Sequence, residues 1–258
     1  MKNYGLVSII TPSYNAGKYI GEMIESIQSQ SYTNWELIIT DDCSTDDTRE
    51  VIKYYVESDS RIKLFKLQVN SGAGLARNNS LKIASGRFIA FCDSDDRWLP
   101  DKLQKQLCFM AEKDCGFSYT SYLTCDDNGK NIGIRVSPKV VSYSSMLRDD
   151  KVGCLTIIYD TEKVGKIYLP TLRKRQDWAM KLKILEKCRV AYGMKEPLAI
   201  YRMSSDSLSR NKRKLVKYNI AVYTNVLKWS KVKAYLFFSL VFMPSYLLKL
   251  FFFKQINK

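Results

Sequence analysis

Residues 7–15 read VSIITPSYN, and they begin the pattern that decides the fold. The run from Val7 to Ile10 is apolar and β-branched and ends at Thr11-Pro12, which predicts a buried strand. Further apolar runs alternate along the chain with segments of helical spacing: strands at 36–40, 62–67 and 87–92, and helices at 18–30, 51–56 and 75–84. This order predicts an α/β fold with a mostly parallel, Rossmann-like sheet flanked by helices.

Polar residues follow the ends of these predicted strands. Thr11 to Asn15 follow the first strand, Asp41-Asp42 the second, and Asp93-Ser94-Asp95 the fourth. Because ligands of such sheets bind beyond the carboxyl ends of the strands, we expect the functional site at this edge. Asp42 could accept hydrogen bonds from a base or ribose, or it could cap the next helix. The pair Asp47 and Glu50 predicts a capping box at that helix.

Asp93 and Asp95 form the sharpest motif. Alternate residues of an extended segment point the same way, so the two carboxylates can converge on one cation. A solvated acidic loop is the alternative, but the position behind an apolar strand and before Trp98-Leu99-Pro100 favours a metal site. The chain contains no histidine. Oxygen ligands favour Mg²⁺ or Mn²⁺ over Zn²⁺, and acid–base chemistry falls to other side chains.

Two further segments carry candidate residues. The segment 72–77, GAGLAR, nearly fits G-x-G-x-x-G, but it ends in Arg77 and follows the third strand, which argues against a dinucleotide-binding loop. Arg77 could instead pair with a diphosphate. Asp177 opens a predicted helix at 176–187, and the residues alone favour a structural acid at the positive end of the helix dipole.

The second half of the chain is less regular. We expect helices at 101–112 and 176–187, strands at 116–123, 155–159, 189–194 and 198–201, and a hairpin turn at 127–129. The seven cysteines are odd in number and contain no C-x-x-C pair, which predicts reduced thiols in a cytosolic protein.

Charge is concentrated at the C-terminal end. The net charge is +15, and residues 201–258 hold 12 Lys and Arg against one acid, so they carry +11 and the first 200 residues carry +4. A basic, apolar tail favours an anionic membrane surface over nucleic acid. The uncharged run 234–248 would extend only roughly 22 Å as a helix, less than the ~30 Å hydrocarbon core. A helix in the membrane interface fits better than a span, with a buried core helix as the alternative.

Together these motifs resemble the family 2 glycosyltransferases, which have the GT-A fold. The matching segments are 7–15, 41–46, the G-x-x-x-x-R-N segment at 72–78, 93–96 with 98–100, and 175–178, and the resemblance covers about residues 4 to 210. Tyr201-Arg202 and Ser207-Leu208-Ser209 resemble the family's closing segment. Many members carry a histidine there and this chain has none, so a third protein ligand to the metal is not identified.

The resemblance implies roles for the candidate residues. Thr11, Tyr14 and Asp42 would contact the nucleotide of a UDP-sugar, and Arg77 would lie near the base or diphosphate. Asp93 would contact ribose or metal and Asp95 would hold Mn²⁺ or Mg²⁺, while Asp177 would be the general base of an inverting transfer. Residues 1–210 would form the catalytic domain, with a nucleotide-sugar half at 1–100 and an acceptor half at 101–210. Residues 211–258 would form a membrane-associating helical tail.

The resemblance also implies a substrate class. Short bacterial members with similar basic tails transfer glucose or galactose in a beta linkage to lipid-linked acceptors such as GlcNAc-diphosphoundecaprenol during O-antigen or other surface polysaccharide synthesis. Such a protein would lie at the cytoplasmic face of the inner membrane, as a peripheral or monotopic protein. The alternatives are a sugar nucleotidyltransferase, which needs a Gly- and Lys-rich triphosphate loop, and a non-catalytic membrane-associated nucleotide-sugar-binding protein. A nucleic-acid-binding protein would need base-stacking aromatics beside the basic cluster in the first 230 residues, and no such interleaving is found there.

Overall fold

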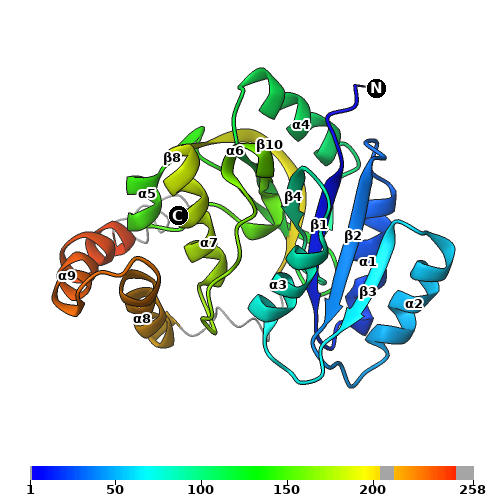
Figure 1. The fold of residues 1–258 in the computed structure, drawn as a ribbon, viewed down its shortest axis with the longest axis horizontal. Helices are drawn as coiled ribbons and strands as arrows, with labels where there is room; N and C mark the ends of the chain where they lie inside the picture. The colour runs from blue at the N-terminus through cyan, green and yellow to red at the C-terminus, as the bar shows by residue number, and fades with distance from the viewer. Residues whose placement is uncertain (1, 204–211, 248–258) are drawn as a thin grey trace.

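The structure, a computed structural model, describes residues 2–203 and 212–247. Its first half alternates strands and helices as the sequence predicts (Figure 1). The elements are β1 (Val7–Ser13), α1 (Gly17–Gln28), β2 (Trp35–Asp41), α2 (Thr48–Ser58), β3 (Ile62–Lys66), α3 (Ala73–Ile83) and β4 (Phe88–Phe91). The strands lie in the order β3-β2-β1-β4, and all three neighbouring pairs are parallel. Their carboxyl ends therefore meet at one edge, where we expected the site.

The second half extends the same sheet in the order β4-β9-β6-β10-β5. Its elements are β5 (Arg97–Trp98), α4 (Lys102–Glu112), β6 (Phe117–Cys125), β7 (Asn131–Arg135), β8 (Val140–Ser142), α5 (Tyr143–Arg148), β9 (Ile158–Asp160), α6 (Thr161–Val164), α7 (Gln176–Cys188) and β10 (Val190–Arg202). Here β9 runs antiparallel to both neighbours, and only β6 and β10 pair in parallel. The expectation of a mostly parallel sheet is wrong for this half, because the regular strand–helix crossovers that impose parallel direction stop after β4.

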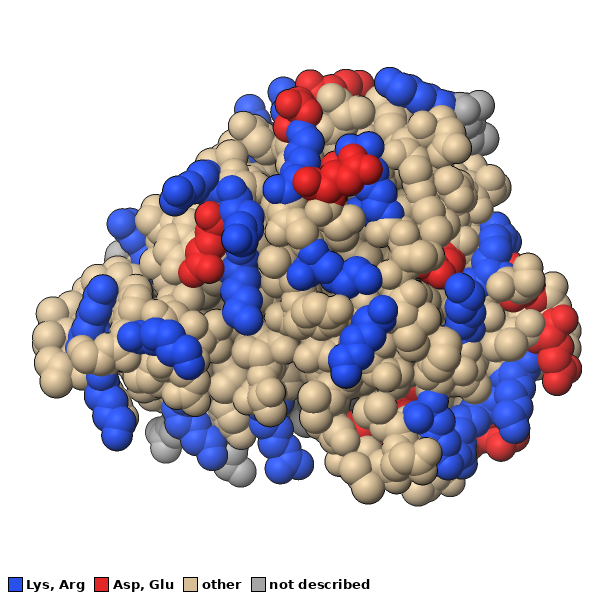
Figure 2. Space-filling view, viewed as in Figure 1, with Lys and Arg blue, Asp and Glu red and all other residues tan. Residues whose placement is uncertain are grey.

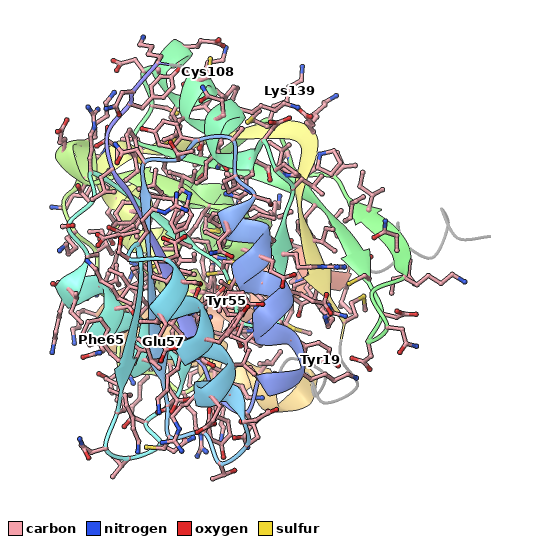
Figure 3. The ribbon with its side chains drawn as sticks, turned by 90° about the vertical axis from the view of Figure 1, so that its right-hand side faces the viewer. Tyr19, Tyr55, Glu57, Phe65, Cys108 and Lys139 are labelled. Carbon is pink, nitrogen blue, oxygen red and sulfur yellow. The ribbon has the colours of Figure 1, made fainter. Side chains whose placement is uncertain are left out.

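Helices cover both faces of the sheet. The alternation of apolar residues along β1 and β2 divides the core, with Ile9 and Leu37 on one face and Ile10 and Ile38 on the other. The first face packs against α1, α2 and α4, and the second against α3, α5 and α7. Figure 3 shows α1 and α2 side by side, with Tyr55 reaching from α2 to α1, where its hydroxyl donates to Glu25 at 2.8 Å. The sheet thus forms the middle of three layers.

Three local expectations need correction. The strand predicted at 155–159 is only Ile158–Asp160, β9, because Cys154–Thr156 forms a short 3-10 helix before it. The two strands predicted at 189–194 and 198–201 form one strand, β10, because Pro197 produces shifts of register against β6 without ending the pairing. The capping box of Asp47 and Glu50 is also wrong. Although α2 begins after Asp47, that side chain makes no capping bond. The Asp46 carboxylate accepts instead from the amide of Thr48 at 3.2 Å and from the amide of Gly17 at 3.1 Å, which ties α2 to the start of α1.

The C-terminal segment packs against the second face of the core. It contains α8 (Lys212–Ala221), a wider helical turn at Val222–Val226, and α9 (Lys231–Phe237), which continues as helix to residue 247. Ala234, Phe238 and Phe242 are buried, and the Phe242 ring lies 5.9 Å from that of Trp178 in α7. The buried-helix alternative therefore holds for one face of α9. Within the described residues no helix is long and apolar enough to cross a membrane.

Candidate active site

The end of β2 is closed by hydrogen bonds to main-chain amides. Asp42 is buried, and its two carboxylate oxygens accept from the amides of Ser71 and Gly72, at 2.6 and 2.7 Å. Gly72 has a φ of +88°, a conformation that glycine adopts without a Cβ penalty, and it directly precedes α3. The neighbouring Asp41 accepts from the amide and hydroxyl of Ser44. Asp42 thus fixes the loop that leads into α3, and a nucleotide would use its remaining lone pairs.

The end of β1 holds the two other residues expected to contact the nucleotide. Thr11 is fully buried, and its hydroxyl donates to the carbonyl of Cys92 at 2.8 Å. Its side chain therefore joins the ends of β1 and β4 and offers no surface to a ligand in this structure. Tyr14, just beyond β1, is 51% exposed. Of these two residues, only Tyr14 has a side chain that is accessible to a ligand.

The first turns of α3 connect the two halves of the site. Arg77 is buried and forms an ion pair with Asp93, which follows β4. A Cβ at Gly74 would lie 2.5 Å from the Gln176 side-chain oxygen, so glycine at this position permits the close approach of α3 to the start of α7. Arg77 thereby reaches the acceptor half as well, and its positive charge contributes to lowering the pKa of Asp177. The glycines of the GAGLAR segment therefore serve loop geometry and helix packing.

Arg202, at the end of β10, holds the turn 93–96 through hydrogen bonds. The main-chain amide of Arg202 donates to the buried carboxylate of Asp96 at 3.0 Å, and its Nε donates to the carbonyl of Asp95 at 3.1 Å. Its Nη2 donates to Glu22 of α1 at 2.8 Å, and its guanidinium lies over the ring of Tyr19, which Figure 3 shows at one end of α1. Arg202 thus fixes the backbone that carries Asp93 and Asp95.

This turn suits a hard divalent cation in the kind of ligand it offers. Burial and the nearby charge of Asp93 raise the pKa of Asp95 to about 6, so a cation beside it would stabilise the carboxylate. One oxygen of Asp93 is already paired with Arg77. No three His, Cys, Asp or Glu side chains converge as a metal site anywhere in 2–203 or 212–247. Asp93 and Asp95 are the two carboxylates that this turn would offer to a cation.

Asp177 lies in the first turn of α7 and contacts a buried lysine. Lys181, one turn later, places its Nζ 3.0 Å from Asp177 Oδ2, 2.7 Å from Asp150 Oδ1 and 2.7 Å from the carbonyl of Val152. Burial acts to raise the pKa of Asp177, but Lys181, with smaller contributions from Arg77 and Arg175, lowers it to about 2. The Asp177 side chain remains one-third exposed. Its lowered pKa favours the ionised carboxylate.

The structure thus brings most of the predicted residues around α3. Asp42 contacts the loop before α3 and Arg77 lies on this helix. Arg77 pairs with Asp93 and interacts electrostatically with Asp177. The sequence analysis missed Asp150, Lys181 and Glu22. Lys181 has a recognisable signal, because it follows Asp177 by four residues on one helix face. No local pattern marks Asp150 or Glu22. The segment Ser207-Leu208-Ser209 lies outside the described residues, as do residues 248–258 of the predicted tail.

The comparison with protein families identifies the class. Residues 8–165 match the model of glycosyl transferase family 2, and the chain belongs to that family. It is 45% identical over 230 residues to the putative teichuronic acid biosynthesis glycosyltransferase TuaG of Bacillus subtilis, covering 89% of this chain and 91% of TuaG. It is 41% identical over 214 residues to WfgD of Escherichia coli, a UDP-Glc:alpha-D-GlcNAc-diphosphoundecaprenol beta-1,3-glucosyltransferase, covering 82% and 83% of the two chains.

Solved structures show the same fold. The crystal structure of Staphylococcus aureus TarS in complex with UDP-GlcNAc superposes with a TM-score of 0.67 at 22% identity, covering 88% of this chain and 69% of that one. A mannosyltransferase of Pyrobaculum calidifontis, in complex with GDP-Man and Mn²⁺, gives a TM-score of 0.61 at 18% identity, covering 87% and 64%. The chain is a glycosyltransferase with the GT-A fold, a mixed sheet flanked by helices.

Proposed function

We propose that this enzyme transfers a hexose from a UDP-sugar, with inversion, to a lipid-linked acceptor such as GlcNAc-diphosphoundecaprenol. Relatives that are 40 and 41% identical are named as glucosyltransferases that use UDP-Glc and that acceptor, which supports glucose over galactose as the transferred sugar. The observation that carries the proposal is the position of Arg77. It pairs with Asp93 and its charge acts on Asp177, and α3 packs closely against the start of α7 where Gly74 meets Gln176. These observations support one site with a donor side at Asp93 and an acceptor side at Asp177.

The reaction follows from these charges. Cleavage of the anomeric bond leaves negative charge on the nucleoside diphosphate, and Arg77 would stabilise that charge from the first turns of α3. A bound Mn²⁺ or Mg²⁺, held by Asp95 and Asp93, would supply further charge neutralisation. Asp177 would accept the proton of the acceptor hydroxyl as that oxygen attacks the anomeric carbon from the opposite face. A single displacement of this kind inverts the configuration and gives a beta linkage from an alpha-linked donor.

The test is a panel of donors against one acceptor. The purified protein is incubated with UDP-Glc, UDP-Gal, UDP-GlcNAc or GDP-Man and a short-chain GlcNAc-diphospho-lipid, with and without EDTA. We expect a product of one added hexose, a beta anomeric signal by NMR, and loss of activity with EDTA that Mn²⁺ restores. An alpha product would reject inversion. Release of pyrophosphate from UTP and a sugar phosphate would favour the nucleotidyltransferase, and binding of donors without transfer would favour the non-catalytic alternative.

The exposed face of α9 supports a location at a membrane. Opposite its buried face, Val232, Leu236 and Leu240 are 55 to 71% exposed and line an open apolar groove together with Lys233. Residues 212–247 contain seven Lys or Arg and no acidic residue. Figure 2 shows basic and uncharged surface over α8 and α9, without acidic side chains in that view. We propose that this face lies on the anionic cytoplasmic surface of the bacterial inner membrane, which would bring the site to its lipid-linked acceptor.

Point substitutions test this location better than truncation, because Phe238 and Phe242 belong to the core. We expect Leu236→Glu with Leu240→Glu to reduce sedimentation with vesicles of phosphatidylglycerol and phosphatidylethanolamine by about tenfold or more. Tyr54→Glu is the matched control, because Tyr54 is 71% exposed on α2, far from α9 in the fold. Equal binding of all three proteins, or binding that ignores salt, would reject the proposed surface.

A further inference from the structure

Lys181 is a buried charge for which the proposed reaction has no direct use. Its side chain is fully buried on α7, and its Nζ contacts oxygen atoms: both carboxylate oxygens of Asp150 at 2.7 and 2.8 Å, the Val152 carbonyl at 2.7 Å, and Asp177 Oδ2 at 3.0 Å. An ammonium group has three protons to donate, and these three acceptor groups account for them. The lysine is therefore fixed in place.

The arrangement is directional. Asp150 and Val152 lie in the segment after α5, so they anchor Lys181 from outside α7. Lys181 contacts Oδ2 of the Asp177 carboxylate. The other carboxylate oxygen, Oδ1, lies outside this contact. Asp150 is also less exposed than Asp177, with side-chain exposures of 13% and 33%. Asp150 thus anchors the lysine, whereas Asp177 keeps one oxygen outside the contact and is the more exposed of the two carboxylates.

We propose that Lys181 is a positioning residue for the transfer reaction, which orients Asp177 through one carboxylate oxygen and keeps it ionised, while Asp150 holds Lys181 in place. This inference rests on the proposed role of Asp177 as the base. Its chemistry is that of a buried ion pair in which removing one partner leaves an uncompensated charge. Without Lys181, the carboxylates of Asp150 and Asp177 would face each other, and both would bind protons more readily.

Other charged groups also act on Asp177 and must stay constant in the test. Arg77 of α3 and Arg175, just before α7, both lower its pKa, and the thiol of Cys154 lies near enough to interact with it. Of the cationic groups, Lys181 has the largest influence, and the pKa of Asp177 is about 2 with all of them present. Removing an opposite charge at this distance raises a carboxyl pKa by about 1 to 3 units.

The experiment measures the ionisation of Asp177 in two ways. The first is the pH profile of kcat with the UDP-sugar and lipid acceptor. The second is labelling by carbodiimide and glycine ethyl ester, which modifies the protonated carboxyl and is quantified by mass spectrometry of the peptide that contains Asp177. For Lys181→Met we expect a midpoint shifted upward by at least one pH unit in both measurements. We also expect kcat at pH 7 to fall by about tenfold to 100-fold through lost orientation, with the KM for the donor nearly unchanged.

Three variants separate positioning from folding. Lys181→Met with Asp150→Leu removes the pair together, so it should fold when the single variant does not, and it should keep the upward shift. Lys181→Arg should restore much of kcat, because it retains the charge. Lys102→Met replaces the second fully buried lysine among the described residues, which contacts Gln106 and the ring of Trp98, and it should leave the Asp177 midpoint unchanged.

An unchanged midpoint of Asp177 labelling in both Lys181→Met and the double variant would overturn the inference. An equal shift in Lys102→Met would overturn it as well, since the effect would then be general. The labelling does not need turnover. If the wild-type protein transfers no sugar but Lys181→Met still raises the midpoint of Asp177 labelling, the proposed function is rejected. The influence of Lys181 on Asp177 is then upheld.

Discussion

The two sides of the site hold their carboxylates by different means. At the end of β2, on the proposed donor side, Asp42 is held by two main-chain amides of one loop. On α7, at the proposed acceptor side, Asp177 is held by the ammonium group of Lys181, which is itself anchored by Asp150. Main-chain N–H groups fix a geometry, because each of them requires an accepting oxygen in line with it. A buried cation also fixes the charge of its partner. The contacts of Asp42 therefore fix the geometry of a loop, whereas those of Asp177 also determine its protonation state.

The largest expected effect concerns the acceptor side. Asp177→Asn removes the only base proposed for the acceptor hydroxyl, so we expect kcat to fall by ~100-fold or more. The affinity for UDP should remain nearly unchanged, because the donor-side contacts of Asp42 and Arg77 are retained. Lys181 keeps Asp150 and the Val152 carbonyl as partners, so the thermal midpoint should change little. Turnover is measured by UDP release and affinity by calorimetry, and normal turnover would rule out Asp177 as the base.

The corresponding change on the donor side should give the opposite result. Asp42→Asn retains one carbonyl oxygen but places the NH₂ of its side-chain amide, which is a donor, against the N–H of Ser71 or Gly72. Losing one charge-assisted bond at a buried position costs about 1.5–3 kcal/mol in the free energy of unfolding. We expect this loss in urea unfolding, together with a higher KM for the donor and a smaller change in kcat. If Asp42→Asn kept full stability and Asp177→Asn lost it, the two sides would not differ as we describe.

The difference between the two sides also explains what the sequence could predict. Asp42, Asp93 and Asp95 follow apolar strands within a few residues, and parallel direction brings those strand ends together, so local pattern was enough. The parallel half was predictable because each strand–helix crossover imposes the direction of the next strand. Arg77 and the GAGLAR segment were noticed, but the packing of Gly74 against Gln176 joins residues about a hundred positions apart.

The remaining parts of the site depend on contacts that no local pattern records. Asp150 meets Lys181 across 31 residues, and Arg202 reaches Glu22 across 180. The reversal of β9 and the single long strand β10 likewise depend on pairing partners and not on propensity. From the residues alone Asp177 looked like an ordinary acid at a helix start, and only the family resemblance assigned it a role. Buried charge networks are hard to predict because their energy comes from partners brought together by the whole fold.

Lys102 provides the smallest and most specific test of the comparison, because it is a buried lysine that pairs with an amide oxygen and an aromatic ring. Burial lowers the pKa of Lys102 from 10.5 to about 7. Burial acts in the same direction on Lys181, but Asp150 and Asp177 raise the pKa of that lysine above its usual value. Between pH 7 and 10.5 the unfolded chain binds the proton that folded Lys102 lacks, so this residue makes stability rise with pH by up to about 1.4 kcal/mol per unit.

Lys102→Met should remove that slope. The variant should be more stable than the wild type near pH 7, and its advantage should shrink as the pH approaches 10.5, because the unfolded lysine is then also neutral. The difference between the two urea unfolding curves, measured across this range, isolates Lys102 from every other titrating group. A difference that is constant with pH would mean that Lys102 stays charged in the fold. In that case burial alone would not neutralise a lysine here, and the need for Asp150 beside Lys181 would have to be explained by packing.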